Sequence, residues 1–215
     1  MMRFTNRQQA GKLLADKLAG YKGQDVVVLA LPRGGIVLGA EIAAVLGAPL
    51  GIVHVRKIAH PSSPEFAIGA VAEDDEPLMD EYEQRVVDQM WLRQAITDAR
   101  DLIKYRRELY GIHNGINVKD KTVVLVDDGI ATGLTMLAAI RQVHKQGAKS
   151  IVVAVPVSAA ECIEVIGPLV DDIVILDNPQ NFLGAVGAHY DTFEQVSDDE
   201  VKRLLHRSDY PNPRS

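Results

Sequence analysis

Residues 123–135 read VVLVDDGIATGLT, and this stretch indicates the fold class of the chain. It begins with a continuous apolar run, typical of a strand buried on both faces, and it continues into a segment with helical spacing. Between the two lie adjacent carboxylates, Asp127 and Asp128, and a loop of small residues. Ligands bind at the carboxyl edge of the strands in an open α/β sheet. The stretch therefore predicts a ligand site where the strand ends.

Strand-like and helix-like segments alternate on both sides of this stretch. Apolar runs rich in Val and Ile predict buried strands at residues 26–31, 50–55, 122–126, 151–155 and 173–176. Helical spacing of apolar residues predicts helices at residues 7–19, 36–46, 134–146 and 159–166. The alternation predicts an α/β fold with a mostly parallel sheet of about five strands, flanked by helices.

Residues 56–120 interrupt this alternation. The segment begins with a polar, proline-marked loop and becomes one long helix at about residues 83–109. Because it holds no strand of core type, we expect residues 72–120 to be a helical insertion or lid. Residues 1–207 are expected to form a single domain that includes this insertion, and residues 208–215 a flexible tail.

The composition excludes several classes of protein. The 215 residues are 47% hydrophobic and 24% charged, which excludes wholesale disorder. The net charge of −6 provides no general attraction to nucleic acid or to an anionic membrane, so neither is expected as a partner. The one cysteine, Cys162, fits a reducing compartment and is interpreted as a small buried residue. Since no signal peptide or membrane span is evident, we expect a cytoplasmic protein.

The loop after the acidic pair is suited to bind a phosphate. Its small residues leave backbone N–H groups open to an anion at the start of the next helix, and Thr132 and Thr135 add hydroxyl groups. A Walker A loop is excluded because no Lys follows Gly133. A Rossmann oxidoreductase is excluded because the G-x-G-x-x-G fingerprint is missing. Carboxylates accept hydrogen bonds from vicinal hydroxyl groups, so Asp127 and Asp128 beside this loop indicate a ribose 5-phosphate.

Residues 124–135 resemble the phosphoribosyl-pyrophosphate (PRPP) signature of type I phosphoribosyltransferases, and the string DDGIATGLTMLAA is similar to that of the adenine phosphoribosyltransferase branch. The resemblance implies that Asp127 and Asp128 hold the ribose and, through water, a Mg²⁺ ion carried mainly by the pyrophosphate of PRPP. The alternative is an Asp pair that only caps a helix. The resemblance assigns the 5-phosphate to Gly129, Ile130, Ala131, Thr132, Gly133, Leu134 and Thr135.

Two further segments resemble the same family. Residues 31–47 are similar to its pyrophosphate-binding loop and the helix that follows, with Arg33, Gly34 and Gly35 at the matching positions. By itself, a Gly-Gly pair after a strand indicates only a turn. Arg56 and Lys57 resemble the basic pair that opens the family's mobile catalytic loop. We therefore expect residues 56–67 to be mobile in the empty protein and to close over PRPP.

The acceptor base is less well indicated. The segments PRGG, PEFAIGA and VDDGIATG are most similar to those of phosphoribosyltransferases without an assigned function. Adenine specificity does not transfer, because residues 58–61 read IAHP where the adenine enzymes have a basic, Gly-containing loop. In this family a hood built from chain termini covers the base. Residues 177–193 are the candidate, with Phe182, Val186 and Tyr190 to stack on the ring, although these side chains could equally close the core.

The resemblance implies an enzyme that moves the 5-phosphoribosyl group from PRPP to a purine or pyrimidine base and releases pyrophosphate. Arg33, Lys57 and Mg²⁺ would neutralise the pyrophosphate, and Arg56 would help to bind it. Asp127 and Asp128 would hold the ribose. The competing hypothesis is a catalytically silent regulator that binds PRPP with the same fold. The identity of the base and the formation of a homodimer stay open.

Overall fold

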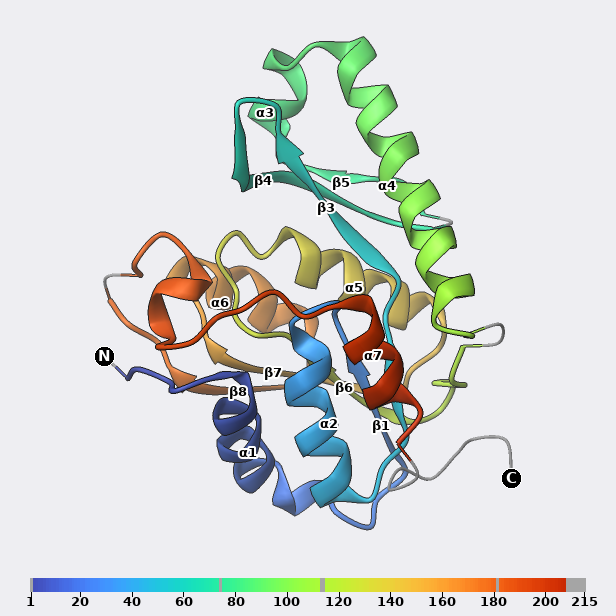
Figure 1. The fold of residues 1–215 in the computed structure, drawn as a ribbon, viewed down its shortest axis with the longest axis vertical. Coiled ribbons are helices and arrows are strands. Elements are labelled where there is room, and N and C mark those ends of the chain that lie inside the picture. The colour runs from blue at the N-terminus through green and yellow to red at the C-terminus, as the bar shows by residue number, and fades with distance from the viewer. Residues whose placement is uncertain (1, 74, 113–114, 181, 208–215) are drawn as a thin grey trace.

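A computed structural model describes residues 2–73, 75–112, 115–180 and 182–207. The expected flexible tail, residues 208–215, lies outside these ranges. Five parallel strands form the main sheet in the order β2-β1-β6-β7-β8 (Figure 1). Their bounds are β1 (Val26–Ala30), β2 (Leu50–Ile52), β6 (Thr122–Val126), β7 (Ser150–Val157) and β8 (Asp172–Asp177). The predicted α/β fold with a five-stranded parallel sheet is confirmed.

Helices cover both faces of the main sheet. One face carries α1 (Arg7–Lys17), α2 (Gly35–Leu46) and α7 (Asp198–Leu205). The other carries α5 (Leu134–Lys145) and α6 (Ala160–Ile166). Short 3-10 turns lie at η1 (Ala19–Tyr21), η2 (Gly167–Leu169) and η3 (Val186–His189).

The strands divide their side chains between these two helical layers. In β6, Val124 and Val126 pack toward α1 and α2, whereas Val123 and Leu125 pack toward α5 and α6. Alternate residues of a strand point to opposite faces, so a strand between two layers must be apolar at every position. This is the physical reason that continuous Val-rich runs identify the strands of the main sheet.

A second unit projects from the main sheet, and we call its described residues within 55–109 the arm (Figure 1). Its antiparallel sheet has the order β3-β4-β5, and two helices follow. The bounds are β3 (Val55–His60), β4 (Ser63–Ala72), β5 (Leu78–Met79), α3 (Glu81–Val86) and α4 (Gln89–Leu109). Ile58, Ile68 and Val71 pack against Leu92 and Ile103 of α4, which gives the arm a small core of its own.

The arm corrects two expectations from the sequence. The polar loop expected after Arg56 is a β-hairpin, because its apolar residues pack against α4, a surface that is distant in sequence. The single helix expected at residues 83–109 is two helices, since the Asp88 side chain accepts a hydrogen bond from the Trp91 backbone N–H at 2.7 Å and caps a new helix.

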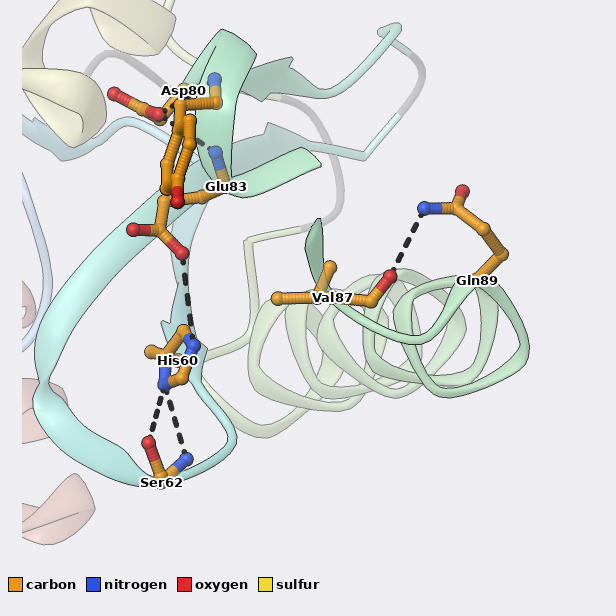
Figure 2. A network of polar contacts seen from close by, with 7 residues as sticks. His60, Ser62, Asp80, Glu83, Val87 and Gln89 are labelled. Carbon is orange, nitrogen blue, oxygen red and sulfur yellow. Dashed lines mark hydrogen bonds and ion pairs between the residues drawn. The ribbon is translucent and has the colours of Figure 1, made fainter. Parts of the chain in front are cut away.

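Polar contacts join the hairpin tip to α3. Figure 2 shows His60 between Ser62 and Glu83, with Asp80 at the start of the helix. The Ser62 hydroxyl and backbone N–H lie 2.8 and 3.2 Å from His60 Nδ1, and His60 Nε2 lies 3.6 Å from Glu83 Oε2. Asp80 accepts from the Glu83 backbone N–H at 2.9 Å. These contacts hold the tip of the hairpin against α3.

The segment before α1 pairs with the segment after η3. The Phe4 backbone N–H donates to the His189 carbonyl at 2.9 Å, and the Phe4 carbonyl accepts from the Asp191 backbone N–H at 2.8 Å. The Phe4 and Tyr190 rings lie 5.5 Å apart at their centroids. Of the helices in the described ranges, none is long and apolar enough to cross a lipid bilayer.

Candidate active site

A cavity of about 290 Å³ opens at the carboxyl edge of the main sheet. Its floor is Asp127, Asp128 and the loop at residues 129–133, which follow β6 and lead into α5. Lys57 and Ala67 of the arm, Arg7 of α1 and residues 184–187 with Phe193 complete its walls. The sequence-predicted acidic pair and phosphate loop therefore share one cavity with residues from three distant parts of the chain.

The loop before α5 has the features of an anion site. Gly133 has a φ of 76°, a left-handed conformation that favours glycine, and no side chain caps the helix behind it. Ala131 and Thr132 are exposed, and Thr135 also lines the cavity. The Ile130 backbone N–H is bonded to the Val157 carbonyl at 2.9 Å, so it belongs to the scaffold. The first-turn N–H groups of α5 are therefore available to an anion.

The two acids differ in their surroundings. Asp127 Oδ1 accepts a hydrogen bond from the Asp128 backbone N–H at 2.8 Å, whereas Asp128 Oδ2 accepts from Arg7 Nε at 2.7 Å. Burial raises the pKa of Asp127 well above its usual value, and the nearby Asp128 charge raises it further. Burial also raises the pKa of Asp128, but the Arg7 guanidinium opposes this effect. Of the two acids, Asp128 is therefore the one whose charged form has a hydrogen-bonded cationic partner.

Arg7 is held by several groups at once. Its Nη1 donates to the Glu194 carbonyl at 2.6 Å, and its guanidinium carbon lies 3.7 Å from the centroid of the Phe193 ring. The Arg7 side chain is 12% exposed. A cation in the first turn of a helix is opposed by the helix dipole, so the Asp128 carboxylate supplies the compensating charge. Arg7 thus connects α1, the acidic pair and the segment after η3.

Gly34 and Gly35 are required by close packing against the acidic pair. A Cβ at Gly34 would lie 1.8 Å from Asp128 Oδ2, and a Cβ at Gly35 would lie 2.6 Å from the Val126 carbonyl oxygen. Gly34 has an ordinary helical conformation, with φ −61° and ψ −43°. The glycines let the loop after β1 lie directly against the end of β6.

The two basic residues expected to act as a pair face different cavities. Lys57 lines the 290 Å³ cavity, whereas Arg56 lines a second, very small cavity with Arg106 of α4. Both lie on β3, where neighbouring side chains point to opposite faces. Arg33 also points away from the main cavity, with its Nη1 3.9 Å from Asp198 Oδ2.

The three residues predicted to stack on the base lie in different surroundings. Val186 lines the cavity and packs so closely on Gly129 that a Cβ there would lie 2.6 Å from Val186 Cγ1. The Phe182 ring stacks on His189 with centroids 4.9 Å apart. Tyr190 is 3% exposed, and its hydroxyl donates to the Asp128 carbonyl at 2.7 Å. Burial raises the pKa of Tyr190, so this hydroxyl stays protonated.

A family model described as a phosphoribosyl transferase domain matches residues 5–191. The chain belongs to this family. "Putative phosphoribosyl transferase Rv0571c" of Mycobacterium tuberculosis strain H37Rv is 39% identical over 214 residues. The match covers 97% of this chain and 47% of that protein, so the chain spans about half the length of the curated relatives it matches.

Solved structures have the same fold as this chain. TT1426 from Thermus thermophilus is 43% identical, with a TM-score of 0.75 over 95% of this chain and 98% of that one. AQ2163 from Aquifex aeolicus is 13% identical, with a TM-score of 0.52 over 93% of this chain and 85% of that one, and it supports the fold alone. The expected type I phosphoribosyltransferase fold is confirmed.

A shorter match is to a regulator. A stretch of 43 residues is 54% identical to "Transcriptional regulator GfcR" of Methanosphaera stadtmanae. It covers 20% of this chain and 22% of that protein.

The donor set of this cavity fits Mg²⁺ only with help from a substrate. Within the described residues, no group of three or more His, Cys, Asp or Glu side chains is placed to hold a metal ion. Mg²⁺ is commonly bound by one or two carboxylates together with substrate phosphates and water. Asp127 and Asp128 can supply these one or two carboxylates.

Two residues of the cavity have no signal in the sequence. Arg7 follows a helix cap in a stretch without a motif, and Phe193 is one apolar residue among many. Arg7 reaches Asp128 across a separation of 121 residues. Only the pairing of the segments around Phe4 and Tyr190 places it there.

Proposed function

We propose that this domain transfers the 5-phosphoribosyl group of PRPP to a nitrogenous base and releases pyrophosphate. One observation carries the proposal: Asp127 and Asp128 share a cavity with the loop before α5, where Ala131 and Thr132 are exposed, and with Thr135 in the first turn of that helix. An anion site next to two partly buried acids would repel most phosphate ligands. It suits a sugar phosphate, because the hydroxyl groups of the sugar separate the phosphate from the carboxylates and donate to them.

The phosphate loop supplies the anchor for the 5-phosphate. The backbone N–H groups of the first turn of α5 point along the helix axis, and their dipoles favour a bound anion. The Thr132 and Thr135 side chains both line the cavity and can donate hydroxyl hydrogen bonds. Gly133 holds the left-handed turn between these two residues, at the start of the helix.

The acidic pair would act most strongly in the transition state. As the bond from C1 to pyrophosphate breaks, positive charge develops on the ribose ring, and a nearby carboxylate stabilises that charge more than it stabilises neutral ribose. The Arg7 guanidinium opposes the rise in the pKa of Asp128 that burial causes, so it favours the charged form of this carboxyl. Asp127, with its raised pKa, is better suited to orient a ribose hydroxyl and the Asp128 backbone.

The leaving group needs positive charge, and Lys57 is the basic residue of the arm that lines the cavity. Mg²⁺ bound to the pyrophosphate would add further neutralisation, with Asp127 and Asp128 as its protein contacts through water. The base would enter below residues 184–187, where Val186 offers an apolar surface. Closure of residues 56–67 over PRPP, a homodimer and a cytoplasmic location all stay predictions.

The test is release of pyrophosphate from PRPP and Mg²⁺ with a panel of purine and pyrimidine bases. We expect at least one base to support turnover, and PRPP to raise the unfolding temperature as a ligand of the native state. If millimolar PRPP produces neither a calorimetric heat nor protection against unfolding, the proposal is wrong.

A PRPP-binding regulator is the second candidate, and the short match to GfcR favours it. A regulator requires PRPP affinity without turnover. Tight PRPP binding, combined with no pyrophosphate release across the whole panel of bases, would select it over the enzyme.

A further inference from the structure

Tyr190 connects the segment after η3 to the backbone of the acidic pair. Its hydroxyl donates to the Asp128 carbonyl at 2.7 Å, across 62 residues of sequence. Its ring contacts the rings of Phe4 and Phe193, with centroids 5.5 and 4.9 Å away. Tyr190 is 3% exposed and does not line the 290 Å³ cavity, so its side chain does not contact a ligand bound there. Any effect of this hydroxyl on the site must pass through Asp128.

Arg7 holds the side chain of the same acid. Arg7 Nε donates to Asp128 Oδ2 at 2.7 Å, and the two side chains are 12% and 15% exposed. The ion pair occupies the space next to Gly34, where a Cβ would lie 1.8 Å from Asp128 Oδ2 and 2.9 Å from Arg7 Nε. A side chain at position 34 would therefore push the two groups apart.

Both residues belong to one unit of the fold. The segment before α1 is hydrogen-bonded to the segment after η3 through both backbone groups of Phe4. Arg7 Nη1 adds a hydrogen bond to the Glu194 carbonyl at 2.6 Å. We call residues 4–7 and 189–194 the clamp. The clamp thus joins two segments that are far apart in the sequence and holds one acid of the site between them.

Asp128 is fixed at three points. Its carbonyl is bonded to Tyr190, its carboxylate to Arg7, and its backbone N–H to Asp127 Oδ1 at 2.8 Å. Two of these three contacts come from the clamp. A misplacement of about 1 Å in a reacting group can cost on the order of 100-fold in rate, so such contacts can matter for turnover without touching the substrate.

We propose that Tyr190 and Arg7 are positioning residues: Tyr190 fixes the backbone of Asp128 and Arg7 fixes its Oδ2, so that Oδ1 is directed at the ribose. The inference rests on the proposed function, in which Asp128 stabilises positive charge on the ribose ring. Stabilisation of this kind depends on groups that are held in place before the reaction. Arg7 also lines the cavity, so the test must separate its action through Asp128 from a direct contact with the substrate.

The test is steady-state kinetics with PRPP on variants of the full chain. Tyr190→Phe keeps the ring and removes only the hydroxyl, so kcat should fall about three- to tenfold while the KM for PRPP stays within about twofold. Arg7→Gln should lower kcat about 10- to 100-fold, since a hydrogen bond to a charged group is lost. Arg7→Lys keeps the positive charge and should recover part of this loss.

Each variant has a matched control outside the cavity. Tyr21→Phe removes a hydroxyl that donates to Asp172 Oδ2 at 2.9 Å. Arg3→Gln breaks an exposed ion pair with Asp191 of the clamp. Both controls should keep the kcat and KM of the parent. A loss in Arg3→Gln as large as that in Arg7→Gln would show that the clamp only has to be intact, and it would refute the positioning role of Arg7.

Double variants decide whether the two residues act through Asp128. In an Asp128→Asn background, Arg7→Gln or Tyr190→Phe should change kcat by less than about twofold, because the carboxylate to be positioned is already gone. If the losses multiply, the two residues act elsewhere and the inference is overturned. The comparison does not depend on the size of the single losses.

The outcomes for this inference and for the proposed function are distinct. Parental kcat in Tyr190→Phe and Arg7→Gln, in a protein that turns over PRPP, would reject the inference and leave the proposed function intact. Absence of turnover with every base would reject the proposed function instead. Crystal structures of the parent and Tyr190→Phe then test the clamp by itself: a displaced Asp128 carboxylate supports it, and an unmoved carboxylate contradicts it.

Discussion

The edge of the main sheet and the arm contribute to the same cavity in different ways. The sheet edge supplies a compact set of groups, residues 127–135, that is held between a buried strand and a helix. The arm supplies single side chains, among them Lys57, from strands that pack on a small core of their own. The difference suggests a division of labour, in which the sheet edge binds the sugar phosphate and the arm supplies charge for the leaving group.

The sheet edge should carry the largest effect. Asp128→Asn removes the carboxylate that pairs with Arg7, and we expect kcat to fall about 10- to 1,000-fold, corresponding to roughly 1.5–4 kcal/mol. The KM for PRPP should change less, because the charge matters most in the transition state. Asp127→Asn should cost less than Asp128→Asn. Steady-state kinetics measure kcat and KM in both acid variants, with Asp101→Asn at an exposed position on α4 as the control. If both acid variants keep the kcat of the parent, the role given to the pair is refuted.

The packing of the sheet edge can be broken without removing a charge. In Gly35→Ala the new methyl group would lie 2.6 Å from the Val126 carbonyl oxygen, so we expect a loss of about 1–3 kcal/mol of unfolding free energy. Gly20→Ala is the matched control, since nothing lies within 4 Å of a Cβ there. Urea denaturation measures both variants. Equal stabilities would show that the loop after β1 can move away from β6.

A smaller effect is expected from the arm. Lys57→Gln should lower kcat about tenfold, since one cation near the leaving group is lost while the sugar-phosphate groups stay in place. Lys104→Gln, at an exposed position on α4, should behave like the parent. A loss in Lys57→Gln as large as that in Asp128→Asn would contradict the division between the sheet edge and the arm.

The smallest effect concerns acid stability at His54, which lines the small cavity with Arg56 and Arg106. Burial lowers the pKa of His54 to about 4, whereas the unfolded side chain titrates near 6.5. Between these values the unfolded state binds the proton and the folded state does not, so stability present above pH 6.5 is lost as the pH falls toward 4. Between pH 6.5 and pH 4, the unfolding free energy measured by urea denaturation should therefore fall less steeply in His54→Gln than in the parent. His206→Gln, at an exposed position, is the control. If the unfolding free energy depends on pH equally in His54→Gln and the parent, the lowered pKa of His54 is disproved.

The main sheet could be predicted because its signals are local. Each βα unit carries a continuous apolar run followed by helical spacing, and β6 begins and ends as the sequence predicted. The β3–β4 hairpin could not be predicted in this way, since its apolar residues form a core only when they pack against α4. The expectation that Arg56 and Lys57 act together failed for a related reason. Both residues lie on β3, where neighbouring side chains point to opposite faces, and the sequence did not predict that strand.

The site shows the same limit. Asp127, Asp128 and the phosphate loop are contiguous, so their proximity follows from the sequence. The position of Arg7 beside Asp128, and the small cavity that Arg56 shares with Arg106, depend on contacts between distant elements. No local pattern encodes such contacts.

The contacts of Arg7 also order events during translation. Its two polar partners, Asp128 and Glu194, follow 121 and 187 residues later in the chain. At roughly 5–20 residues per second, a ribosome needs about 10 to 40 s to make the longer stretch. The central strands can associate during that interval, while the wall of the cavity formed by Arg7 and Phe193 is still missing. A nascent chain would therefore acquire its fold well before its ligand site, and PRPP could assist only the last stage of its maturation.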